Sequence, residues 1–240
     1  MKKVLLYSGG MDSWLIDKIW KPDVKIYINI HGAYSEEEIK KLPSDVKIID
    51  CPFLGQFEED KTKYIPLRNL YFLMIASHYG EHICFGATAG DYGAIDKRPE
   101  FIDKAQDIIN YTLGNQSVSE GKQIKIEKKF VYMSKYEIVE EYLNQGGDIK
   151  TAIDSTFSCF EPKDGKECLN CKPCFRKFML GYYFGYEYSN SEKLKMSKYI
   201  KENVIPKSNQ KTGTYYKDRI KEGEYLEEAV NKLLKKMEVE

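Results

Sequence analysis

The 240-residue sequence has no excess of charge of either sign, because 37 Lys and Arg residues balance 37 Asp and Glu residues. A protein that coats an extended polyanion generally carries a clear basic excess. The balance therefore disfavours a broad nucleic-acid surface, and it leaves room only for a local basic patch.

Long apolar runs are also missing, and we expect no secretion signal. No stretch reaches the 18 apolar residues that a membrane-spanning helix needs, and the first apolar run ends at Tyr7. We also find neither an internal repeat nor a low-complexity tract. A hydrophobic content of 42% is nevertheless sufficient for a folded core. We therefore expect a soluble cytoplasmic protein that makes no contact with a membrane.

Short β-type segments alternate with helical ones along most of the chain. Apolar runs and period-two patterns predict strands at 3–7, 25–30, 46–50, 83–86 and 122–131. Helical spacing predicts helices at 12–20, 35–42, 68–79, 99–111 and 134–144, and Ser35 and Ser134 each begin a capping-box pattern. This alternation predicts an α/β fold with a doubly wound, mostly parallel sheet.

The distribution of motifs predicts three parts. We expect residues 1–150 to form the α/β domain, residues 151–188 to form a metal-binding segment, and residues 189–240 to form a helical appendage. The aromatic run 175–188 is expected to pack beneath the metal-binding segment or at a dimer interface.

Four of the six cysteines lie close together, at Cys159, Cys168, Cys171 and Cys174. In a chain without a predicted export signal, such a density favours metal binding over disulfides. Four thiolates suit Zn²⁺ in a closed tetrahedral site, and a closed site has a structural role. An iron–sulfur cluster uses the same ligands and stays open as an alternative.

A turn of small residues follows the first predicted strand. The segment from Ser8 to Ser13 has the sequence Ser-Gly-Gly-Met-Asp-Ser and leads into a predicted helix. Small residues allow backbone N–H groups at a helix N-terminus to approach an anion, which suits phosphate. The spacing fits neither the Walker motif nor the dinucleotide fingerprint. The alternative is an ordinary turn in which Asp12 or Ser13 caps the helix.

This hexapeptide resembles the SGG-x-D-S signature of the PP-loop ATP pyrophosphatase superfamily. Together with the cysteine spacing it resembles the QueC family of 7-cyano-7-deazaguanine (preQ0) synthases. Three further segments carry the same resemblance: Tyr64 to Asn69 is similar to the family's P-x-R-N segment, Asp96 to Ile102 to its D-x-R-P-E-F-I segment, and Thr156 to Cys159 to its T-x-S-C segment. The resemblance covers about residues 3 to 180.

The resemblance implies an ATP-dependent enzyme with small-molecule substrates. In that family ATP, with Mg²⁺, adenylates 7-carboxy-7-deazaguanine, ammonia displaces AMP to give an amide, and a second ATP drives conversion of the amide to the nitrile. The resemblance further implies structural Zn²⁺ and a homodimer. Two alternatives stay open: an adenylating enzyme that makes an amide or joins a deazaguanine to another amine, and a non-catalytic zinc module that binds nucleic acid.

The resemblance also assigns residues to the two ligands. It implies ATP binding by the turn, the helix start and the segment after Pro66, with Asp12, Ser13 and Arg68 acting in catalysis. The ATP-binding set is Ser8, Gly9, Gly10, Met11, Asp12, Ser13, Trp14, Leu15, Arg68 and Asn69. The set assigned to the deazaguanine is Asp91, Asp96, Arg98 and Glu100, for which an ordinary ion pair or a flexible surface loop is the alternative.

Some positions differ from the family pattern. Lys97 stands where a Cys often separates the Asp and the Arg, and Gly90 precedes Asp91 where an acidic residue is usual. His31-Gly32-Ala33 replaces a Tyr-Gly-Gln segment, and we expect His31 to face the nucleotide.

Overall fold

The computed structural model describes residues 1–32, 35–159, 161–162, 165–208 and 223–237. The chain divides into two compact units, Met1–Tyr132 and Met133–Glu240.

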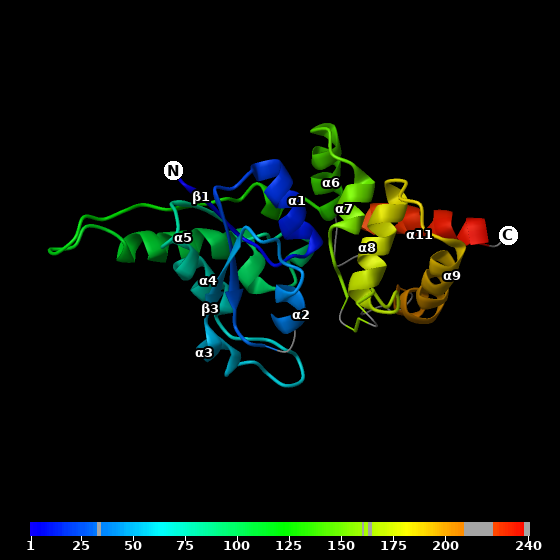
Figure 1. The fold of residues 1–240 in the computed structure, drawn as a ribbon, viewed down its shortest axis with the longest axis horizontal. Coiled ribbons are helices and arrows are strands. Elements are labelled where there is room, and N and C mark those ends of the chain that lie inside the picture. The colour runs from blue at the N-terminus through cyan, green and yellow to red at the C-terminus, as the bar shows by residue number, and fades with distance from the viewer. Residues whose placement is uncertain (33–34, 160, 163–164, 209–222, 238–240) are drawn as a thin grey trace. The chain divides into compact units, whose positions relative to one another are not determined.

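The first unit contains a five-stranded sheet in which every neighbouring pair of strands is parallel. Figure 1 labels β1 and β3 of this sheet. The strand order is β3-β2-β1-β4-β5. The strands are β1 (Lys3–Leu6), β2 (Val24–Asn29), β3 (Val46–Asp50), β4 (His82–Cys84) and β5 (Lys125–Ile126). The helices are α1 (Met11–Trp20), α2 (Ser35–Ile39), α3 (Pro52–Gly55), α4 (Arg68–Ala76) and α5 (Pro99–Thr112), with short 3₁₀ helices η1 (Ala89–Asp91), η2 (Ile95–Lys97) and η3 (Phe130–Tyr132).

Helices cover both faces of this sheet. On one face, buried side chains such as Val4 and Ile26 share a core with residues of α4 and α5. On the other face, Lys25 of β2 forms an ion pair with Asp17 of α1 at 3.4 Å, and Tyr27 donates to Glu38 of α2 at 2.7 Å. These two sets point in opposite directions because successive strand residues alternate between faces. The arrangement confirms an α/β fold with a parallel sheet.

Three predicted elements are clearly shorter than expected, and one of them is the helix 68–79, which ends at Ala76. The predicted strand 122–131 pairs only at Lys125 and Ile126, because β4 itself is three residues long and offers only His82 and Ile83 as partners. The predicted helix 35–42 ends at Ile39. The expected capping box between Ser35 and Glu38 does not form. Ser35 is already the first residue of the helix, and the Glu38 carboxylate accepts a hydrogen bond from Tyr27 instead.

The second unit is helical. Its elements are α6 (Lys135–Asn144), α7 (Ile149–Asp154), α8 (Lys172–Tyr183), α9 (Asn190–Tyr199), the π-helix η4 (Ile200–Val204), α10 (Ile205–Ser208) and α11 (Gly223–Met237). The predicted capping box at Ser134 is confirmed, because Ser134 and Glu137 exchange side-chain-to-backbone hydrogen bonds.

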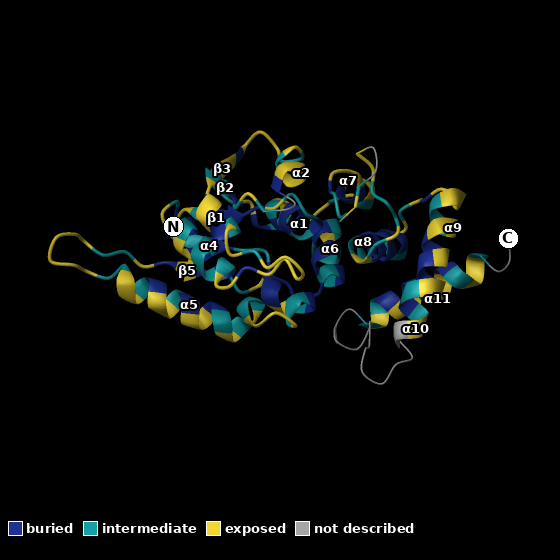
Figure 2. Cartoon of the chain, turned by 90° about the horizontal axis from the view of Figure 1, so that it is seen from below, coloured by how far each residue is buried: buried dark blue, intermediate teal, exposed yellow. Residues whose placement is uncertain are grey.

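Helix α8 forms the centre of this unit, and Figure 2 shows it mostly in the buried colour. The Phe178 ring stacks on Tyr188 with centroids 3.8 Å apart, and Phe175 contacts Tyr199 of α9. Phe175, Phe178 and Tyr188 of the aromatic run are therefore buried within this unit. Every helix among the described residues is too short or too polar to cross a bilayer.

The turn between α4 and β4 gives a test of the sheet's packing. A Cβ atom at buried Gly80 would lie 2.5 Å from the Lys2 carbonyl oxygen and 2.7 Å from Val4 Cγ2. Because both neighbours belong to the β1 segment, we expect Gly80→Ala to lower the free energy of unfolding by about 2 kcal/mol. Urea denaturation of the full chain measures this change.

The matched control is Gly93→Ala, since nothing lies within 4 Å of a Cβ at that exposed position. Its free energy of unfolding should change by less than about 0.5 kcal/mol. Equal destabilisation by the two substitutions would contradict the close approach at Gly80.

Candidate functional site

A cavity of about 400 Å³ lies at the carboxyl ends of β1, β2 and β4. Open parallel sheets bind ligands at this edge, where connections leave toward opposite faces. Of the residues predicted for ligand binding, the cavity wall includes Ser8, Gly10, Asp12, Ser13, Arg68, Asn69 and Asp91.

The turn after β1 presents the start of α1 to this cavity. Gly9 has a φ of +75°, a left-handed conformation that favours glycine, and Gly10 is extended just before the helix. The Ser13 hydroxyl donates to the Gly10 carbonyl oxygen at 3.0 Å and lies 3.3 Å from the Ser8 nitrogen, whose N–H it accepts. Ser13 therefore braces the turn, and the N-cap position, Gly10, offers no side chain to the first helical N–H groups. This geometry favours the anion-site hypothesis over simple capping.

The other residues of α1 that were predicted to bind ATP have side chains in the core, outside the cavity wall as the described residues form it. Met11, Trp14 and Leu15 are buried side chains of α1, with Leu15 fully inaccessible. Their packing fixes the helix on the sheet, so contact with a nucleotide at these positions would come from the backbone. Such a contact stays a prediction.

Arg68 brings a cation to the cavity from the first turn of α4. The preceding Leu67 has a φ of +62°, which an L residue adopts at a cost, and it turns the chain into the helix. The Arg68 Nε is buried and has no hydrogen-bond partner among the described residues. Its guanidinium carbon lies 5.9 Å from the centre of the Phe72 ring. Because Arg68 also lines the cavity, its guanidinium suits an anionic ligand there.

Sequence reasoning missed an acidic part of the same wall. Glu38 and Tyr27 both line the cavity and share a hydrogen bond of 2.7 Å. Surrounding protein atoms desolvate the Glu38 carboxylate and raise its pKa, although solvent still reaches the side chain, and Tyr27 and Arg68 oppose the shift. The pattern Ser35-x-x-Glu38 was interpreted as a capping box, so no feature of the sequence indicated that Glu38 lines the cavity.

The residues assigned to the deazaguanine divide into two groups. Asp91 lines the cavity. The other three, Asp96, Arg98 and Glu100, lie at or just before the start of α5, and none of them belongs to the cavity wall that the described residues form. Arg98 donates from Nε to the Tyr92 carbonyl oxygen at 2.7 Å. The Asp96 carbonyl oxygen accepts from Asn69 Nδ2 at 3.3 Å, so Asn69 contacts a loop backbone.

His31 is directed away from the expected position. Its Nε2 lies 3.0 Å from Asp50 Oδ1, at the end of the neighbouring strand, and its ring is exposed. The residues on either side of it, Ile30 and Gly32, line the cavity in its place.

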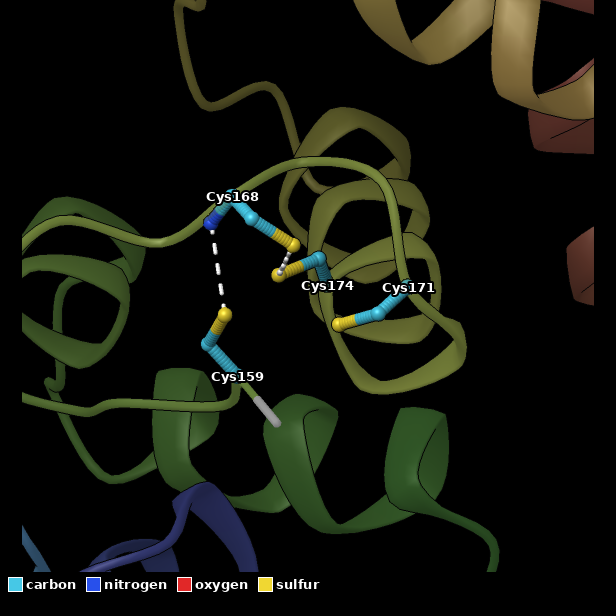
Figure 3. Close-up of side chains that lie close together, drawn as sticks. All are labelled: Cys159, Cys168, Cys171 and Cys174. Atoms are coloured by element: carbon cyan, nitrogen blue, oxygen red, sulfur yellow. Dashed lines mark hydrogen bonds between the residues drawn. The ribbon is translucent and has the colours of Figure 1, made fainter. Parts of the chain in front are cut away.

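The four predicted cysteine ligands converge in the second unit (Figure 3). Their sulfur atoms all lie within 4.8 Å of one another, as a metal site requires. Cys159 follows α7, Cys168 lies in the next loop, and Cys171 and Cys174 lie at the start of α8. The Cys168 N–H donates to Cys159 Sγ at 3.3 Å, which orients that sulfur toward the others. These residues could hold a metal ion.

The electrostatics of the cluster explains why a bound cation would stabilise it. Burial raises the pKa of the Cys174 thiol, and a hydrogen bond with Cys171 and its charge raise it further. Four crowded thiolates are therefore unfavourable on their own, and a bound metal ion would stabilise them.

A buried ion pair behind the cluster was not predicted. Lys177 Nζ lies 2.9 Å from Glu167 Oε1 and donates to the Thr156 carbonyl oxygen at 2.6 Å. The same Glu167 oxygen accepts from the Ser158 N–H at 2.6 Å. The pair thus joins α8 to the segments that carry Cys159 and Cys168. The sequence signal that could have indicated this pair is the position of Lys177 among the aromatic and apolar residues of α8, next to Phe178.

Fold and site together define an α/β protein with a ligand cavity at the carboxyl edge of its sheet and a separate four-cysteine cluster. A sequence profile described as "Queuosine biosynthesis protein QueC" matches residues 44–180. The chain belongs to the QueC family. The matched range includes Arg68, the connection after β4 and all four cysteines, and the Ser8–Ser13 turn precedes it.

Curated relatives agree with this assignment. The chain is 31% identical over 210 residues to the 7-cyano-7-deazaguanine synthase of Citrifermentans bemidjiense, covering 72% of this chain and 89% of that protein. It is 35% identical over 208 residues to the enzyme of the same name from Coxiella burnetii, covering 72% and 89%. It is 38% identical over 123 residues to that of Leptospira interrogans, covering 49% and 48%. No solved structure matches the chain.

The ion pair behind the cysteines gives a stability prediction. We expect Lys177→Met to lower the free energy of unfolding by about 3 kcal/mol, because it leaves the largely buried Glu167 carboxylate without its cation. Chemical denaturation measures the loss. The affinity of the four cysteines for added Zn²⁺ should also fall, since the segments bearing Cys159 and Cys168 lose their tether to α8.

Two further variants separate the pair from general damage. Exposed Lys166→Met is the matched control and should change neither measurement. The double variant Lys177→Met with Glu167→Gln should be less destabilised than the two single losses added together. Strictly additive losses would show that the pair carries no coupling.

Proposed function

We propose that this protein uses ATP to convert 7-carboxy-7-deazaguanine and ammonia to 7-cyano-7-deazaguanine (preQ0). The observation that carries the proposal is one cavity whose wall includes both the start of α1 and Arg68, whose buried Nε has no hydrogen-bond partner among the described residues. Membership of the QueC family and the printed names of the relatives supply the substrate class.

The phosphate side of the reaction rests on the turn after β1. Backbone N–H groups of Ser8 to Ser13 would bind the leaving pyrophosphate, and Arg68 would offset its charge. Preorganised donors of this kind stabilise the charge that develops as pyrophosphate leaves. The Asp12 carboxylate, which also lines the cavity, would hold Mg²⁺, and the ion supplies further charge neutralisation.

The chemistry on the second substrate needs two activations. A carboxylate oxygen attacks the α-phosphorus of ATP and pyrophosphate leaves, and ammonia then attacks the carbonyl carbon and displaces AMP. A second ATP adenylates the amide oxygen, and loss of AMP and of the nitrogen protons gives the nitrile. We keep Asp91, Asp96, Arg98 and Glu100 as the proposed deazaguanine contacts. No covalent bond to the enzyme is needed.

We further propose that the four cysteines hold structural Zn²⁺. The donor set fits, because four thiolates complete a tetrahedral shell and leave no position for a substrate. In this proposal residues 1–150 bind ATP, residues 151–188 bind the metal, and residues 189–240 are an appendage. A homodimer is proposed from the family resemblance.

Product analysis tests the reaction. Purified protein with ATP, Mg²⁺, ammonium and 7-carboxy-7-deazaguanine should release AMP and yield the nitrile, identified by its mass. Asp12→Ala should lower the rate of AMP release by about a hundredfold or more, since it removes the carboxylate proposed to hold Mg²⁺ beside the phosphates. Metal analysis should find about one zinc ion per chain.

The outcomes separate the alternatives. AMP release that ends in an amide, or in a conjugate with another amine, would replace the proposed product by the second enzyme hypothesis. Salt-dependent RNA binding without AMP release would support the non-catalytic zinc module. Iron and sulfide in place of zinc would contradict the metal assignment alone.

A further inference from the structure

The cavity wall contains a cation that the family motifs do not single out. Lys97 is the last residue of η2, in the connection from β4 to α5, and its side chain lines the cavity with 31% of its surface exposed. The next residue, Arg98, bonds instead to the Tyr92 carbonyl oxygen. The connection therefore turns Lys97 toward the ligand space and Arg98 toward its own backbone.

Hydrogen bonds fix the backbone around Lys97 without help from a ligand. Asn69 of α4 donates to the carbonyl oxygen of Asp96, and the Lys97 N–H donates to the Ala94 carbonyl oxygen at 3.1 Å. Asn69 directly follows Arg68. One helix start thus presents a cation to the cavity and also holds the connection that carries Lys97. A group placed in advance binds its ligand at a lower entropic cost.

Asp91 orients the Lys97 ammonium. Asp91 Oδ2 lies 3.3 Å from the Thr88 nitrogen and 3.2 Å from the Thr88 hydroxyl, and accepts from both. Its Oδ1 lies 3.6 Å from Lys97 Nζ. An ammonium has three donors, and one ion pair of this length engages at most one of them. Lys97 can therefore donate to a ligand while Asp91 keeps it in place.

The position of Lys97 separates it from the phosphate turn. Strand β4 lies beside β1 on the side away from β2, so the connection after β4 borders the cavity from the other side. A third cation of the wall, Lys63, pairs with Glu58 at 3.4 Å. Lys97 is therefore the cation that the connection after β4 contributes to the cavity wall.

We propose that Lys97 Nζ binds the carboxylate of the second substrate and so distinguishes it from the uncharged product. The inference rests on the proposed function, in which 7-carboxy-7-deazaguanine enters as an anion and leaves as a nitrile. Under this proposal Lys97 binds the carboxylate, although the family resemblance assigned its neighbour Arg98, and not Lys97, to the deazaguanine. It also gives a role to the Lys that stands where the family often has a Cys.

Calorimetric titration of the full-length protein tests the contact. With a non-hydrolysable ATP analogue present, we expect Lys97→Met to raise the Kd for 7-carboxy-7-deazaguanine by about ten- to a hundredfold, the range expected for losing a charged hydrogen bond. The Kd values for the nitrile and, in a separate titration, for ATP should change by less than about twofold. Lys97→Arg should restore most of the affinity, because it keeps the charge.

Controls decide between this and other roles. Lys104→Met, at an exposed lysine of α5, should leave every Kd unchanged. Equal weakening of carboxylate and nitrile binding, weakening of ATP alone, or a loss seen only in Arg98→Gln would each overturn the proposal. If the wild-type protein binds both deazaguanines and Lys97→Met leaves their Kd values unchanged, the role of Lys97 is refuted and the proposed function is not. Wild-type protein that binds ATP but neither deazaguanine refutes the proposed function and this contact with it.

Discussion

The parallel pairing of β1 with β2 on one side and with β4 on the other determines where this protein can bind a ligand. The connections through α1 and α2 run over one face of the sheet, and those through α4 and α5 run over the other. At the carboxyl edge the chain therefore leaves β1 and β4 in opposite directions, which opens a cavity there. The turn after β1, the start of α4 and the connection after β4 all reach that space because of this one pairing.

Local patterns in the sequence predicted most of the elements because each pattern has a local cause. The Ser134 capping box forms since both partners lie within one helical turn, and the first strand ends where the glycine turn begins. The length of β5 has no local cause. It depends on how many residues β4 offers, and the alternation of Ile124 and Ile126 cannot show that. The same holds for Glu38, whose partner Tyr27 lies on another element.

The cysteine cluster shows what the spacing of residues in the sequence can predict and what it cannot. Ligands at Cys168, Cys171 and Cys174 recur at intervals that a loop and a helix start bring together, so their convergence was predictable. The ion pair of Lys177 and Glu167 was not, because its role depends on Thr156 and Ser158, which reach it only through tertiary packing. A buried lysine needs such partners, since an isolated ammonium in the core would be strongly unfavourable.

Neighbouring residues in a motif can serve different purposes, and Lys97 and Arg98 show the physical reason. Lys97 is the last residue of the 3₁₀ helix η2, whereas Arg98 has extended backbone between η2 and α5, so the two adjacent side chains leave the chain in different directions. With the Asp96 carbonyl oxygen held by Asn69, Lys97 lines the cavity and Arg98 donates to the Tyr92 carbonyl oxygen. The segment Asp96 to Ile102 predicts a positive charge near the ligand. The hydrogen bonds around η2 then determine which residue supplies that charge to the cavity.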